Sequence, residues 1–113
     1  MCPDISLRLR QEDIGKGSSF IDLRLKNSGS ADYSFDAGRR LEVELGGVWY
    51  IVPDKSPAIT LALYSLPAGE TADIKLQLEG HYVNLPDGHY RVVKCFSDPR
   101  GQQQLASAEF DIN

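Results

Sequence analysis

Two histidines and two cysteines are the side chains of this chain best suited to nucleophilic or metal chemistry. A nucleophilic triad requires a Ser or Cys, a His and an orienting acid that converge on one point. His89 and Cys95 are the one conceivable Cys–His pair. Their spacing along a single strand separates them by roughly 20 Å, which excludes a direct hydrogen bond. We therefore expect His81 and His89 to be surface polar residues, and we predict that the protein is not an enzyme.

Metal and cofactor sites are not predicted either. Zinc needs about four nitrogen or sulfur ligands in compact spacing, and calcium needs several oxygen ligands gathered in one loop. Gly46–Gly47 lacks the strand, glycine-rich loop and helix that surround a bound phosphate. The acidic residues of the loops are isolated and suit the closure of local turns; they are Glu12 and Asp13, Asp32 and Asp36, and Asp98.

The charge balance argues against binding to nucleic acid. The chain has 16 acidic and 12 basic residues among its 113, and a net charge of -4. Non-specific binding to nucleic acid depends on clustered Lys and Arg. The nearest such group includes Asp22 and fits a solvated sheet face better; its basic members are Arg8, Arg10, Arg24 and Lys26. No run approaches the ~18 apolar residues of a membrane span.

Apolar and polar residues alternate along most of the chain, which predicts strands. A Gly46–Gly47 pair suits a two-residue hairpin turn between two of them, because both positions can adopt positive φ. Turn signals recur about every ten residues, which is typical of a two-sheet sandwich. We predict an all-β, immunoglobulin-like antiparallel sandwich of seven to eight strands in a single domain, residues 1–113. The expected strands include 5–10, 21–26, 41–45, 48–52, 73–78, 90–96 and 105–112.

A tyrosine corner is predicted at Leu85, Pro86, Gly88 and Tyr90. In this motif the phenol hydroxyl bonds a backbone group a few residues upstream and fixes one end of the sandwich. If Tyr90 points inward, strict alternation also turns Lys94 inward, where an unpaired charge is costly. We expect either a β-bulge near Lys94 or an ammonium that reaches solvent. If Gly88 has positive φ, Gly88→Val should be destabilising.

Two features leave alternatives open. Residues 58–66 are apolar at most positions and fit a buried strand or a short helical turn, and the flanking prolines favour the strand. Cys2 and Cys95 would lie near one end of an immunoglobulin-like sandwich, in opposite sheets. A disulfide there would stabilise the fold by roughly 2–5 kcal/mol. Two unpaired thiols are the favoured alternative, because Cys2 lies at a terminus that can fray.

Four blocks of sequence, in this order, resemble the bacterial immunoglobulin-like domain family: 41–53, 66–70, 85–94 and 108–112. The first contains a glycine–tryptophan–tyrosine hairpin and the third a glycine-x-tyrosine-arginine strand. The resemblance covers nearly the whole chain. It implies a fold similar to cell-surface modules and an extracellular or cell-surface location, but no shared catalytic or ligand residue. If Met1 is the native start, a cytoplasmic location is the alternative.

A protein partner is the most concrete functional expectation. Both faces of residues 48–52 are apolar, so one face is expected to be exposed or covered by the connection 53–66. Trp49 and Tyr50 are the candidate interface aromatics. We therefore predict a non-enzymatic interaction module. The alternative is a small acidic inhibitor, for example of a host nuclease, that engages a basic groove; its candidate residues are Glu42, Glu44, Asp73, Glu79, Glu109 and Asp111.

Overall fold

The computed structural model confirms an all-β sandwich. It describes residues 4–10, 14–15, 19–36, 38–54, 63–78, 81–82 and 85–112. These residues form nine strands and no helix, so none of them belongs to a helix that could cross a membrane. Seven to eight strands were expected, and the larger number includes two strands of only three residues, Tyr33–Phe35 and Tyr64–Leu66. The strands are β1 (Ile5–Leu9), β2 (Phe20–Asn27), β3 (Tyr33–Phe35), β4 (Arg40–Leu45), β5 (Val48–Ile51), β6 (Tyr64–Leu66), β7 (Thr71–Gln77), β8 (Gly88–Ser97) and β9 (Gln103–Ile112).

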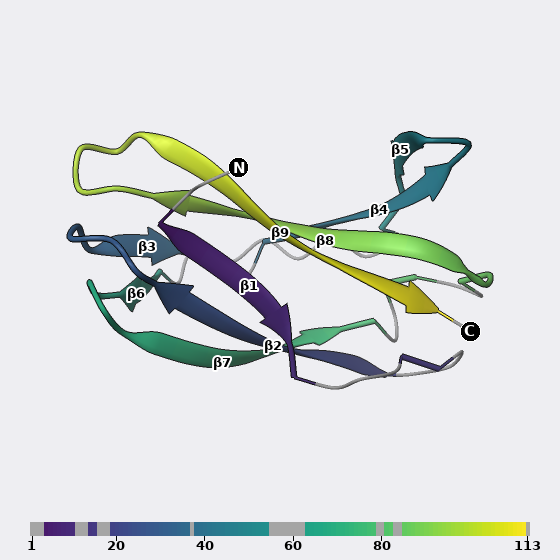
Figure 1. The fold of residues 1–113 in the computed structure, drawn as a ribbon, viewed down its shortest axis with the longest axis horizontal. Helices are drawn as coiled ribbons and strands as arrows, with labels where there is room; N and C mark the ends of the chain where they lie inside the picture. Colours follow the sequence, from purple (N-terminus) through teal and green to yellow (C-terminus); the bar gives the residue numbers. More distant parts are fainter. Residues whose placement is uncertain are drawn as a thin grey trace.

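The two sheets differ in size (Figure 1). The smaller sheet has the order β1-β2-β7, and every pairing in it is antiparallel. In the larger sheet, β8 pairs with β9 along its whole length. The other edge of β8 is shared by β3 and β4, which pair with β6 and β5 respectively. The larger sheet therefore has two partly independent ends, one formed by β3 and β6 and the other by β4 and β5.

Alternation along the strands builds the core between the sheets. Ile21, Leu23 and Leu25 of β2 are at most 1% exposed, whereas the residues between them are not buried. From the larger sheet, Tyr90 stacks on its cross-strand partner Phe110 with ring centroids 5.9 Å apart. Apolar area removed from water in this way is the main driving force for folding.

The tyrosine corner has the expected geometry. Tyr90 is 1% exposed, and its hydroxyl donates a hydrogen bond of 2.7 Å to the carbonyl of Pro86. Leu85 packs against the core beside it. Gly88 does not have positive φ, so the condition for a backbone penalty on Gly88→Val is not met. A Cβ at Gly88 would instead lie 3.5 Å from the Tyr90 ring, an ordinary contact distance.

The β4–β5 hairpin turn confirms the prediction made from its two glycines. Gly46 and Gly47 have φ of 60° and 84°, and Leu45 lies opposite Val48. This combination fits a type I′ turn, whose twist matches that of the flanking strands. In the ambiguous segment 58–66, the last three residues form β6, which supports the strand interpretation there. Residues 58–62 lie outside the described residues.

Lys94 corrects a sequence expectation. It is 1% exposed, and β8 pairs with β9 through it without a bulge. The irregularity lies in the neighbouring strands. The chain advances six positions from Ser34 to Arg40, opposite an advance of only four on β8 from Ser97 to Val93. The link between β3 and β4 therefore has two residues more than the part of β8 opposite it. It cannot pair with β8 throughout, so its carbonyl groups need other hydrogen-bond donors.

Candidate interaction surface

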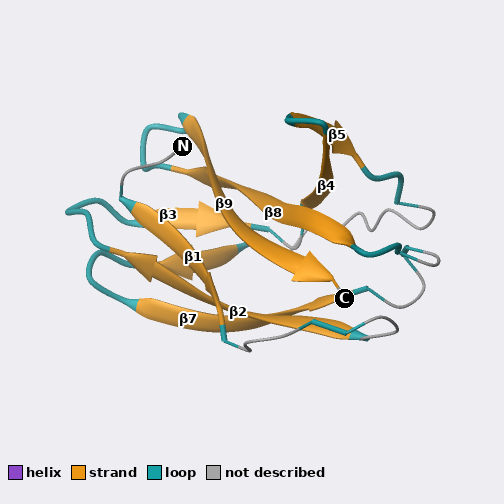
Figure 2. Cartoon of the chain, turned by 45° about the vertical axis from the view of Figure 1, so that its right-hand side comes forward, coloured by secondary structure: helices purple, strands orange, loops and turns teal. Residues whose placement is uncertain are grey.

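The β4–β5 hairpin carries the largest group of exposed apolar side chains in the described part of the chain. Leu45, Val48, Tyr50 and Ile51 are 51–64% exposed. β5 is the last strand at its end of the larger sheet. Figure 2 shows β4 and β5 rising away from the smaller sheet, so no strand of that sheet covers them. Exposed apolar side chains grouped in this way are typical of interaction sites.

The backbone of β5 has one paired edge and one open edge. Val52 donates from its N–H to the carbonyl of Leu41 at 2.9 Å. In an antiparallel ladder, every second residue bonds to the partner strand and the residues between point the other way. Tyr50 and Val48 therefore bond to β4, while the N–H and C=O of Trp49 and Ile51 point to the open edge. No strand in the described residues pairs with that edge.

An ion-pair cluster covers the outer face of the larger sheet beside the hairpin. We define this outer-face cluster as Arg40, Glu42, Trp49 and Arg91. Glu42 is 5% exposed, so it is not the accessible carboxylate that the inhibitor hypothesis requires at this position. Its two carboxylate oxygens accept hydrogen bonds from Arg40 Nε at 2.5 Å and from Arg91 Nε at 2.6 Å. The Arg91 guanidinium lies 4.3 Å from the centre of the Trp49 ring.

Burial and hydrogen bonding act in opposite directions on the carboxylate of this cluster. Burial alone would raise the pKa of Glu42, but the hydrogen bonds from Arg91 and Arg40 outweigh it, so the pKa lies below its ordinary value. The stacking of Arg91 on Trp49 adds a cation–π contact. Because its charges have partners within the cluster, Glu42 is not available to a partner protein. Sequence reasoning missed the cluster because only the strand register brings Glu42 and Arg91 opposite each other.

His89 lies next to this cluster, on the same outer face. Its Nδ1 lies 2.7 Å from Asp111 Oδ1, and its Nε2 lies 2.8 Å from Glu109 Oε1. Hydrogen bonds to Glu109 and then to Asp111 raise the pKa of His89, because both carboxylates favour the imidazolium. The ring also lies 5.6 Å from that of Trp49. The expected outward position of His89 is confirmed.

The acidic residues suggested for an inhibitor are mostly engaged within the chain. Asp73 accepts from Arg24 Nε at 2.9 Å, and Glu109 and Asp111 hold His89. Glu44 is exposed, and Glu79 lies outside the described residues. A surface whose carboxylates are already paired gains less from a basic groove, which weakens the inhibitor hypothesis.

Asp36 and Asp98 close local turns, as predicted. Asp32 instead accepts from the distant N–H of Ala68, and Glu12 and Asp13 lie outside the described residues. Asp36 Oδ1 accepts from the N–H of Gly38 at 2.8 Å, and Asp98 Oδ1 accepts from the N–H groups of Arg100 and Gln102 at 2.9 Å. No cluster of metal-ligating side chains occurs among the described residues.

The described residues do not test whether Cys2 and Cys95 form a disulfide or remain two thiols. Cys95 is partly buried near the end of β8, whereas Cys2 lies outside the described residues. Figure 1 shows the start of β1 at the same end of the sandwich as the β8–β9 hairpin. The choice between a Cys2–Cys95 bridge and two thiols stays a prediction, which a thiol count under denaturing, non-reducing conditions tests.

A sequence profile described as "Bacterial Ig-like domain" matches residues 3–111. No curated protein sequence matches the chain. Among solved structures, the archaellum periplasmic stator protein FlaG from Sulfolobus acidocaldarius is 18% identical, with a TM-score of 0.49, covering 94% of this chain and 99% of its own. The PmoD soluble domain from Methylocystis sp. is 14% identical, with a TM-score of 0.44, covering 100% of this chain and 94% of its own. At such low identities and TM-scores these likenesses say nothing about function.

Proposed function

Because the chain belongs to the bacterial Ig-like domain family, we propose that it is a non-enzymatic module that binds a protein partner. The observation that supports this most directly is the β4–β5 hairpin, which combines exposed apolar side chains with an open strand edge. The family resemblance favours an extracellular or cell-surface location over the cytoplasmic alternative.

The proposed mode of binding is addition of a strand from the partner to β5. In this mode main-chain hydrogen bonds supply affinity, and alternate side chains supply specificity. The outward N–H and C=O groups of Trp49 and Ile51 would form the new ladder. Tyr50 and Val48, each 51% exposed, would pack against the partner's side chains on one face. The contact between Trp49 and Arg91 within the outer-face cluster would hold β5 in place.

An affinity capture from the envelope fraction of the producing organism tests this mode. Ile51→Pro removes the outward N–H without removing a bond to β4, which an edge strand tolerates. Ile51→Ala shortens the side chain but keeps the backbone donor. A protein retained by the wild type and by Ile51→Ala, but lost with Ile51→Pro, supports strand addition.

Equal retention by all three proteins would contradict the proposed site. Thermal unfolding of each variant provides the folding control, because a variant that has lost the hairpin would also lose stability. Turnover of any substrate that disappears on mutation of a single polar residue would contradict the non-enzymatic assignment.

A further inference from the structure

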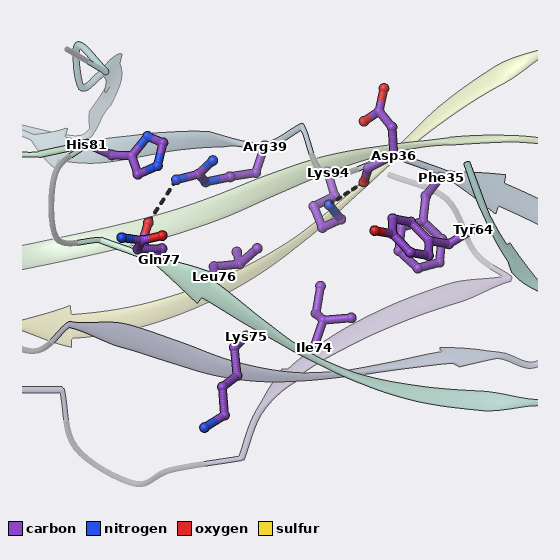
Figure 3. A pocket seen from close by; sticks show the side chains of 10 residues that line it. All are labelled: Phe35, Asp36, Arg39, Tyr64, Ile74, Lys75, Leu76, Gln77, His81 and Lys94. Atoms are coloured by element: carbon purple, nitrogen blue, oxygen red, sulfur yellow. Dashed lines mark hydrogen bonds between the residues drawn. The ribbon is translucent and has the colours of Figure 1, made fainter. Parts of the chain in front are cut away.

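A cavity of about 420 Å³ lies between β7 and the link that joins β3 to β4. This volume is in the range of small-molecule sites. Figure 3 shows its apolar walls, which are Ile74 and Leu76 on β7 and the rings of Phe35 and Tyr64. The two rings stack with centroids 5.5 Å apart. The cavity lies away from the hairpin and is not part of the surface proposed to bind a protein.

The two excess residues between β3 and β4 account for its polar side. Asp36 and Gly38 belong to the link that leaves the ladder, and their carbonyls accept hydrogen bonds from Lys94 Nζ at 3.0 and 2.9 Å. Figure 3 shows the Asp36 carboxylate turned away from Lys94, which meets only its backbone oxygen. Arg39 follows in the same link, and its Nη2 donates to the carbonyl of Gln77 on β7 at 2.8 Å.

Lys94 and Arg39 thus border the same cavity, and each donates its hydrogen bonds to neutral carbonyl groups. Among the described residues, no carboxylate forms an ion pair with Lys94 or Arg39. His81, also at the rim, has its own acid, because its Nδ1 lies 3.0 Å from Asp54 Oδ1. The pKa of Lys94 is lowered to about 8, chiefly by burial; the Asp36 charge opposes this lowering and the Arg39 charge adds to it. Because neither cation contacts a carboxylate among the described residues, an anion in the cavity would give both a charged hydrogen-bond partner.

We propose that this cavity binds an organic carboxylate that carries an apolar body. The carboxylate would lie between Lys94 and Arg39, where charge-assisted hydrogen bonds are strong. The apolar body would lie against the Phe35–Tyr64 stack, Ile74 and Leu76. Most of the wall is apolar, which favours such a ligand over a compact, strongly hydrated anion such as inorganic phosphate. A free small acid and the C-terminus of a polypeptide share this chemistry.

A titration with 3-phenylpropionate, followed by backbone amide chemical shifts, tests the proposal. The perturbed amides should belong to the residues that line the cavity. 3-Phenylpropionamide has the same shape without the charge and should bind about tenfold more weakly. Inorganic phosphate is the probe for charge without an apolar body and should bind more weakly still. Equal affinity for the acid and the amide would overturn the proposal, as would shifts confined to another surface.

Arg39→Gln is the decisive variant, because Lys94→Met can fail to fold. Its affinity for 3-phenylpropionate should fall about tenfold. Arg8→Gln is the matched control: it makes the same change at an exposed position of β1 and should leave the affinity unchanged. An unchanged affinity in Arg39→Gln, with the fold intact, would overturn the proposal.

The source of the carboxylate is decided by a second pair of probes. A short peptide that ends in Phe with a free carboxylate is compared with its C-terminal amide. Tighter binding of the free peptide than of 3-phenylpropionate identifies a polypeptide C-terminus, and the reverse order identifies a free small acid. Ile51→Pro should bind 3-phenylpropionate like the wild type, so failure of the hairpin proposal and failure of this one are distinguishable.

Discussion

The outer-face cluster and the cavity around Lys94 each contain one buried charged side chain, Glu42 and Lys94, but these two side chains have different kinds of partner. In the outer-face cluster, the Glu42 carboxylate receives hydrogen bonds from two arginines. At the cavity, Lys94 meets two carbonyls and Arg39 a third. Of these three side chains, only Glu42 has hydrogen-bond partners of opposite charge among the described residues, whereas Lys94 and Arg39 bond to neutral carbonyls.

This difference separates structural charge from charge available to a ligand. A buried ion pair with complete partners holds strands in register and gains nothing from an added ion. A buried cation held only by carbonyls keeps a field that an incoming anion would complete. The pKa values agree with this contrast. Hydrogen bonds from the arginines lower the pKa of Glu42 and favour its charged form, whereas burial lowers the pKa of Lys94 and disfavours its charged form.

The largest expected effect is a pH-dependent stability difference between the wild type and Lys94→Met. The folded-state pKa of Lys94 is lowered from 10.5 to about 8. Between these values the unfolded chain still holds a proton that the folded chain has released, so stability rises with pH. The wild type should gain about 3 kcal/mol relative to Lys94→Met across this window, measured by urea unfolding.

Other groups that titrate at high pH are largely common to both proteins. Burial raises the pKa values of Tyr82, Tyr90 and Cys95, so they lower stability at alkaline pH in each protein. Lys26→Met, on an exposed position of β2, measures what the loss of any lysine does. A wild-type minus Lys94→Met difference that stays flat with pH would show that Lys94 is not held as a desolvated cation.

In the outer-face cluster, Glu42→Gln should lower the free energy of unfolding by about 2 kcal/mol at neutral pH. The loss is smaller than for a fully enclosed pair, because the Arg91 and Arg40 side chains are 25% and 41% exposed and can find water. Chemical denaturation measures it. Glu44→Gln, at an exposed position of the same strand, should change stability by less than about 0.5 kcal/mol.

Acid provides a second measure of the same cluster. The lowered pKa of Glu42 means that its stabilisation is present above pH 4.5 and is lost as pH falls through the folded-state value. The wild type and Glu42→Gln should therefore converge in stability on acidification. A constant gap between them would mean that packing, not charge, explains the effect.

Tyr90→Phe measures how much a buried hydrogen bond between neutral groups contributes to the free energy of unfolding, for comparison with the two charged sites. It removes only the hydroxyl that donates to Pro86 O. The expected loss is about 1.5 kcal/mol, because a carbonyl is left without its donor. Thermal or urea unfolding measures the loss, and Tyr50→Phe on the exposed hairpin is the matched control. A Tyr90→Phe variant as stable as the wild type would remove the tyrosine corner as an anchor of the sandwich.

What the sequence predicted well depends on local pattern. Alternation located the long strands, and two glycines located the hairpin turn, because periodicity and φ preference are properties of neighbouring residues. The burial of Glu42 depends instead on register between strands far apart in the chain. The alternation along β8 correctly indicated that Lys94 points inward. Its hydrogen-bond partners, the carbonyls of Asp36 and Gly38, could not be predicted, because they depend on the two extra residues between β3 and β4.

Asn27 shows the same limit. It ends β2, next to the turn-forming residues Ser28, Gly29 and Ser30, and it is 0% exposed. Its side-chain amide donates to the carbonyls of Ala31 and Leu66, at 2.8 and 2.9 Å. The second of these carbonyls belongs to β6, far along the chain. No local signal distinguishes such a residue from an ordinary turn asparagine.

The smallest expected effect concerns His89, whose charge is partnered like that of Glu42 but exposed. Its pKa should lie above 6.5, because Glu109 and Asp111 both favour the imidazolium. Its contribution to stability is present below pH 6.5 and is lost as pH rises through the raised value. That contribution is small, because the ring is 37% exposed and its acids 60% and 64%, so solvent and salt screen the pairs.

Titration of the His89 ring protons by NMR measures this pKa directly. Glu109→Gln and Asp111→Asn should each lower it, and the double variant should bring it closest to the ordinary value. Added salt should reduce the shift for the same reason that it weakens exposed ion pairs. If the pKa of His89 lies at or below 6.5 in the wild type, ion pairs with exposed carboxylates do not stabilise the imidazolium on this face. Burial together with complete partners would then distinguish Glu42 from its neighbours.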